Sequence, residues 1–179
     1  NTQDNEHVEC YQIRGSVSRD PHAAVAEWEA QAFTLTRCTN YLYSLSVNPD
    51  QRQGRLTRAQ YLDYIERTER SLGLSGQPRE IWFHIKKDRQ GVPREHCHVF
   101  WSRIDAERGK AIHIPFDHQK LMMVTREFAR DHGLRLPDGY YKDRTKEPRR
   151  TRQMAYYAKR QQDMGGLSPE ERRVQVTDA

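Results

Sequence analysis

The chain lacks two features that mark common protein classes. Its 179 residues include only three cysteines, Cys10, Cys38 and Cys97, which are far apart and form no CxxC pair. An odd number of widely spaced cysteines argues against a disulfide framework and for a reducing compartment. No apolar run reaches the roughly 18 residues of a membrane helix, and no apolar signal segment opens the chain. We therefore expect a soluble cytoplasmic protein.

Apolar residues are also scarce, since hydrophobic types make up 35% of the chain and the mean hydropathy is −1.04. They nevertheless cluster into periodic segments, and the length suits one domain with a real core. Lys and Arg exceed Asp and Glu by 30 to 25, giving a formal charge of +5, which favours a polyanionic partner without proving one. The first residue is Asn rather than Met, so we expect further residues upstream.

The hydrophobic periodicity predicts an α+β domain, an antiparallel sheet with helices packed on it. The helix starts and ends are marked by Asp20-Pro21, Thr57 and Gly73. On the first helix we expect Trp28 and Phe33 on the inner side. Strands are predicted over His7–Arg14, Tyr41–Val47, Ile81–Lys86 and Glu95–Ile104, with a short one at Ala111–Ile114, and helices over His22–Arg37, Arg58–Leu72 and Phe116–His132.

The stretch Ile81–Ile104 has the sequence form of a β-hairpin, two apolar strands joined by a polar loop with Gly91 and Pro93. Because side chains alternate along a strand, His96 and His98 point the same way. His84 lies on the other strand. A turn centred at Gly91 places it opposite His98, one centred at Gln90 places it opposite His96, and one centred between the two breaks the geometry.

An imidazole trio on one sheet face is a candidate metal site. Imidazole is the commonest metal ligand near neutral pH, and three of them leave positions on the ion for water or a phosphate oxygen, as in catalytic sites. The competing interpretation is that an HxH pair lies by chance on a half-exposed strand. The sequence therefore nominates His84, His96 and His98 as metal ligands and leaves both interpretations open.

The chain changes character after Pro137, where basic residues and tyrosines alternate. Such a segment suits a phosphate backbone with bases stacked on aromatic rings. The alternative is a solvated basic helix that only keeps the domain soluble. The DNA-binding candidates are Lys142, Arg144, Arg149, Arg150, Arg152, Tyr156, Lys159 and Arg160.

The HxH strand HCHVFWSRID and its flanks resemble the relaxase/mobilisation nuclease domain, the HUH endonucleases (His, hydrophobic, His) that nick plasmid DNA at a transfer origin. The resemblance runs from Tyr41 to Leu134. The matching blocks are, in order, YLYSLS, SLGL, WFHIKK, the HxH strand, GKAIHIP and FARDHGL, and AKRQQDMGGLSPEERR resembles a segment that follows the nuclease core in some relatives.

The resemblance implies an HUH relaxase-like palm over residues 1–135, with residues 136–179 as a basic DNA-binding extension partly packed on it. It also implies a bacterial enzyme with a divalent metal ion, Mg²⁺ or Mn²⁺. That enzyme cuts single-stranded transfer-origin DNA through a covalent 5′-phosphotyrosyl link. The partners implied are an accessory origin-binding protein, a coupling ATPase and a type IV secretion system. A non-cleaving DNA-binding module of the same fold and an HUH replication initiator are the alternatives.

The sequence departs from the family pattern at three points. The middle residue of HxH is Cys97, a tolerable small replacement. The interval from His84 to His96 is longer than is usual in relaxases, so an oxygen of Asp88 or Glu95 is the alternative third ligand. The family nucleophile, a tyrosine or in some lineages a histidine, precedes the first strand, and we expect it upstream of this chain. Within the chain, Tyr11 is the nearest tyrosine and the catalytic candidate, with packing in the sheet as its alternative role. The remaining candidates are Tyr140, Tyr141, Tyr156 and Tyr157, whose alternative role is DNA stacking or core packing.

Overall fold

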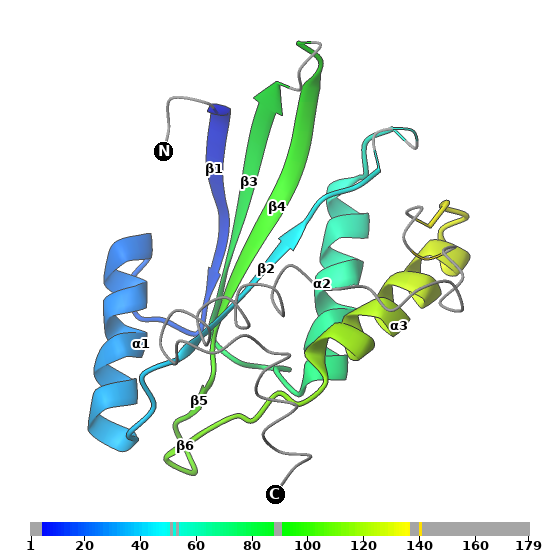
Figure 1. Cartoon of the computed structure of the whole chain (residues 1–179). Coiled ribbons are helices and arrows are strands. Elements are labelled where there is room, and N and C mark those ends of the chain that lie inside the picture. Colours follow the sequence, from blue (N-terminus) through cyan, green and yellow to red (C-terminus); the bar gives the residue numbers. More distant parts are fainter. Residues whose placement is uncertain (1–4, 51, 53, 88–90, 137–139, 141–179) are drawn as a thin grey trace, which may run out of the picture. The chain divides into compact units, whose positions relative to one another are not determined.

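The computed structural model describes residues 5–50, 52, 54–87, 91–136 and 140, and Figure 1 shows their arrangement. The elements are β1 (Asn5–Arg14), α1 (Pro21–Leu35), β2 (Leu42–Val47), α2 (Arg58–Leu72), β3 (Arg79–Lys87), β4 (Pro93–Ser102), β5 (Ile104–Asp105), β6 (Lys110–Ala111) and α3 (Asp117–Asp131). Within these described ranges, no helix is long and apolar enough to cross a membrane.

The main sheet has four strands in the order β1-β3-β4-β2, and every neighbouring pair is antiparallel. The predicted hairpin, β3 and β4, therefore occupies its centre. A separate two-stranded ladder joins β5 to β6. The predicted α+β class, an antiparallel sheet with helices packed on it, is confirmed.

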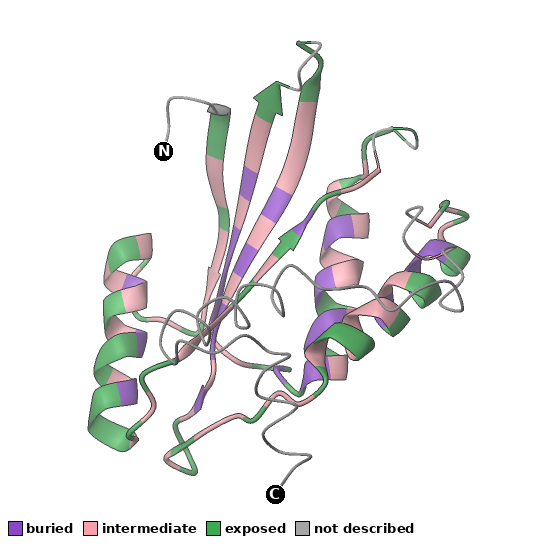
Figure 2. Cartoon of the chain, in the orientation of Figure 1, coloured by how far each residue is buried: buried purple, intermediate pink, exposed green. Residues whose placement is uncertain are grey.

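The core lies between the sheet and α2. Alternate residues of β3 and β4, including Phe83, Cys97 and Trp101, are buried against Tyr61 and Ile65 of α2. Figure 1 shows α2 and α3 on this side of the sheet and α1 on the other, and Figure 2 shows the buried positions along the strands and along α2. The opposite face of the hairpin is left half-buried, and it carries the histidines.

Helix α2 begins and ends at the residues that the sequence marks. Thr57 accepts from the Gln60 amide while the Gln60 side chain accepts from the Thr57 amide, which is a complete capping box. Gly73 closes the helix at φ 75°, a left-handed conformation that favours glycine because it has no Cβ. In α1, Asp20 caps the first turn by accepting from the Ala23 amide.

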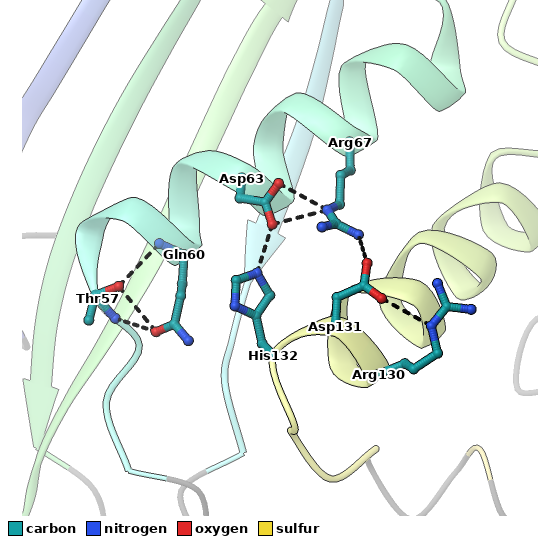
Figure 3. Close-up of polar contacts among 7 residues, drawn as sticks. All are labelled: Thr57, Gln60, Asp63, Arg67, Arg130, Asp131 and His132. Atoms are coloured by element: carbon teal, nitrogen blue, oxygen red, sulfur yellow. Dashed lines mark hydrogen bonds and ion pairs between the residues drawn. The ribbon is translucent and has the colours of Figure 1, made fainter.

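Polar contacts join α2 to α3 at the surface (Figure 3). The Asp63 carboxylate lies 2.7 Å from Nε2 of His132 and 2.9 Å from Nε of Arg67. Arg67 also pairs with Asp131 of α3 at 2.6 Å. These contacts add to the packing of α3 on α2, where the rings of Tyr64 and Phe128 also meet, and α2 in turn supports the hairpin.

The structure corrects two details of the first helix. Phe33 was expected on the inner side but is 66% exposed, because the buried stripe follows Ala24, Trp28 and Ala32 at intervals of four residues. The helix also ends at Leu35 rather than Arg37, since the backbone of Thr36 is already extended, at φ −142°.

Candidate metal centre

The register of the hairpin brings the three histidines together. His84 pairs directly with His96, as expected for a turn centred at Gln90, and Trp82 pairs with His98. Directly opposed residues share a sheet face, and His98 lies two residues from His96 on that face. The rings of His84, His96 and His98 therefore come from two adjacent strands and face one space.

Ring positions agree with a common ligand. The ring centroids are 5.3 Å apart for His84 and His96, 4.8 Å for His84 and His98, and 5.0 Å for His96 and His98. One nitrogen of each ring lies within 4.8 Å of the others. Within the part of the chain that the structure describes, none of the rings is hydrogen-bonded to another protein group, so their nitrogens are available.

Burial keeps these imidazoles neutral. Burial first, and then the charges that His98 and His84 would carry, lower the pKa of His96 to about 4. Burial also lowers the pKa of His84 and of His98. Desolvation disfavours the imidazolium, so at neutral pH each ring keeps a lone pair for coordination. Three neutral nitrogen donors without protein partners fit a divalent metal ion and leave it open positions.

Arg58, at the start of α2, contacts β1, β3 and β4 on the sheet face opposite the histidines. Its guanidinium carbon lies 3.3 Å from the centroid of the Phe83 ring, next to His84 in the chain. Its Nη2 pairs with Glu95 of β4 at 3.2 Å and with Glu9 of β1 at 3.0 Å. Sequence reasoning missed this contact, because nothing local to Arg58 indicates which strands it will cross.

The structure does not place Glu95 as an alternative ligand. It pairs with Ile85, one position away from the histidine pair, so its side chain points to the opposite face. There its carboxylate binds Arg58. The other alternative, Asp88, lies outside the described residues.

Tyr11 is likewise not brought to the histidines. Its ring meets the edge of the buried Phe83 ring at a centroid distance of 5.4 Å. Phe83 faces α2, whereas the adjacent His84 faces the other side. The structure therefore places Tyr11 in a packing contact across the sheet from the rings, and its assignment as the nucleophile stays a prediction.

Other side chains on the histidine face also escaped the sequence analysis. Toward α1 the face carries Trp82, whose indole nitrogen donates to the buried Glu80 at 2.9 Å. Toward the loop it carries Lys86 and Arg94, which pair directly across the strands. The alternation that relates His96 to His98 predicts these faces too, once the register is known. The basic candidates from Lys142 to Arg160 lie outside the described residues.

A family model described as relaxase, MobA/VirD2-like, nuclease domain matches residues 1–134, which is most of the chain. No match was found among the curated proteins or among the solved structures.

Proposed function

The chain belongs to the family of MobA/VirD2-like relaxase nuclease domains, and on this premise we propose that it nicks and rejoins one DNA strand at a transfer origin in a metal-dependent reaction. The observation that supports metal dependence is the group of His84, His96 and His98, half-buried and without hydrogen-bond partners among the described residues. Three half-buried imidazoles whose nitrogens converge within 4.8 Å of one another are the arrangement expected of a divalent metal site.

In the proposed reaction, the three imidazoles would hold the ion, and the sheet fixes the directions of their rings. A bound divalent ion would supply Lewis-acid polarisation of the scissile phosphate and neutralise charge on its oxygens in the transition state. The nucleophile is a tyrosine hydroxyl, by family resemblance. Its oxygen forms a bond to phosphorus and loses its proton, while the bond to the 3′ oxygen breaks and leaves a 3′-OH. The resulting 5′-phosphotyrosyl link keeps the phosphodiester bond energy, so the reverse attack rejoins the strand.

The test uses the natural full-length protein and a single-stranded origin oligonucleotide, with Mn²⁺ or Mg²⁺. We expect H96A or H98A to reduce nicking by at least about 100-fold, more than loss of an outer-shell contact usually does. H113A is the matched control, because His113 is an exposed histidine outside the cluster. Nicking retained by the H96A/H98A double variant would contradict the proposal.

The same preparation separates the alternative functions. Mapping the residue that becomes covalently attached to the nicked oligonucleotide identifies the nucleophile. Metal-dependent binding without any cut strand would instead support a non-cleaving module of the same fold. A cut at a replication origin in preference to a transfer origin would support an HUH replication initiator.

The proposal includes the basic segment after Pro137 as a contact for the DNA backbone. Each phosphate contact of a single strand adds about 0.7 to the slope of log affinity against log salt. Neutralising Arg149, Arg150 and Arg152 together should therefore flatten that slope. An unchanged slope would return the segment to a solvated basic surface.

A further inference from the structure

Two cations face each other at the loop end of the hairpin. Lys86 of β3 pairs directly with Arg94 of β4, two positions beyond the pair formed by His84 and His96. By alternation both begin on the histidine face. Because a strand rises about 3.3 Å per residue, Lys86 and Arg94 lie about 7 Å along the strands from His84 and His96. In Figure 1 this end of the hairpin extends past the end of β2, its neighbour in the sheet.

Like charges that are directly opposed across two strands destabilise a sheet. Among the described residues, no acidic side chain offsets the repulsion between Lys86 and Arg94. In the described ranges neither Lys86 nor Arg94 contacts a carboxylate, and Arg94 reaches only the carbonyl of Pro49 at 3.5 Å. Its Nε is buried without a partner. By contrast, Arg58 and Arg79, on the α2 side of the sheet, are both paired with carboxylates.

We propose that Lys86 and Arg94 form a second phosphate-binding subsite, which holds the DNA phosphate one nucleotide away from the phosphate at the histidines. The inference rests on the proposed function, since it needs a DNA strand on this face. An anion would relieve the repulsion between the two cations, and it would give the Arg94 guanidinium a charged acceptor where the protein provides only the distant carbonyl of Pro49. The separation from the histidines matches the length that one nucleotide of an extended single strand covers.

The adjacent Lys87 provides a matched control. It has the same charge, is also exposed, and points to the opposite face of the strand. We expect K86A to weaken the binding of a short, labelled single-stranded DNA of mixed sequence by roughly fivefold, as for one partly exposed ionic contact. The slope of log affinity against log salt should fall by about 0.7. R94Q should behave like K86A, and K87A should change neither quantity. Binding is measured by fluorescence anisotropy on the Mn²⁺-loaded full chain over a range of salt concentrations.

A stability measurement separates a binding role from a structural one. Because the pair is repulsive, K86A and R94Q should leave the thermal midpoint of the DNA-free protein unchanged or raise it. Equal effects of K86A and K87A on DNA binding would overturn the subsite, as would unchanged binding by K86A and R94Q. So would a loss of thermal stability in both variants that accounts for the weaker binding. Calorimetric titration of the DNA-free wild-type chain with Mn²⁺ tests the proposed function separately. If the chain bound no Mn²⁺ at all, the proposed function itself would fail.

Discussion

The polar groups at the two ends of the central hairpin differ in whether they have hydrogen-bond partners within the protein. At the end where β3 begins and β4 finishes, the buried carboxylate of Glu69 accepts hydrogen bonds from Arg79 at 2.7 Å, Arg14 at 2.9 Å and Trp101 at 2.7 Å. At the other end, the imidazoles of His84, His96 and His98 have no such partner among the described residues. The satisfied buried cluster contributes to the folded state, whereas the half-buried imidazoles keep their nitrogens open to a ligand. The contrast distinguishes the supporting end of the hairpin from the end where we propose that a metal ion binds.

The largest effect is expected at the supporting end. E69A removes the only carboxylate bound to the buried guanidinium of Arg79 among the described residues, leaving it the amide oxygen of Gln12, and it leaves the indole of Trp101 without its acceptor. Breaking a buried ion pair by removing one partner costs about 3–5 kcal/mol, so the free energy of unfolding should fall by that amount in urea denaturation. E66A, an exposed change on the same helix, should stay within about 0.5 kcal/mol of the wild type. A loss of less than about 1 kcal/mol in E69A would remove the contrast between the two ends.

At the binding end, H98A should cost little stability without metal. Its ring has no hydrogen bond to lose, so we expect the free energy of unfolding to change by less than about 1 kcal/mol. With metal, the stabilities of the wild type and of H98A should differ. At 100 times the dissociation constant, Mn²⁺ should stabilise the wild type by about 2.7 kcal/mol and H98A hardly at all.

Thermal melts with and without Mn²⁺ measure this difference, and H113A serves as the control. If Mn²⁺ stabilised H98A and the wild type equally, the histidine cluster would not be the metal site.

The smallest effect concerns the surface contacts between α2 and α3. Hydrogen bonds from Arg67, and then from His132, hold the pKa of Asp63 below its ordinary value. The stabilisation is therefore present above the ordinary carboxylate pKa of about 4, and it is lost as the pH falls through the lower pKa of the folded state. D63N should remove this part of the acid dependence of the urea midpoint, and E66Q should not. A D63N profile parallel to that of the wild type would mean that these contacts contribute nothing to acid stability.

Much of the fold could be predicted from local sequence. The bounds of α2 follow from the capping box at Thr57 and from Gly73, which act within a few residues. The strand periods and the fold class follow from alternation. Helix α1 departs from the prediction, because its stripe of small residues around Trp28 gives no local signal that excludes Phe33 from the inner side. The strands predicted at Ala111–Ile114 and Glu95–Ile104 are also corrected, because β6 is only Lys110–Ala111 and β4 ends at Ser102.

How well the site could be predicted depended on how far apart its residues lie in the sequence. His96 and His98 are two residues apart on one strand, so their common face is fixed by the pleat alone. The position of His84 depended on the length and register of the loop, and the sequence left two registers open. The role of Glu95 depended on Arg58, which lies 37 positions earlier in the chain and on another element.

The sequence by itself determined which residues are able to bind a metal ion and which elements carry them, since alternation and helix capping act over a few neighbouring residues. Only the tertiary structure decided that His84 faces His96, that Glu95 and Tyr11 lie across the sheet from them, and that Lys86 faces Arg94. The physical reason is that strand register and buried ion pairs are set by groups far apart in the chain, which compete for the same partners only once the sheet has formed.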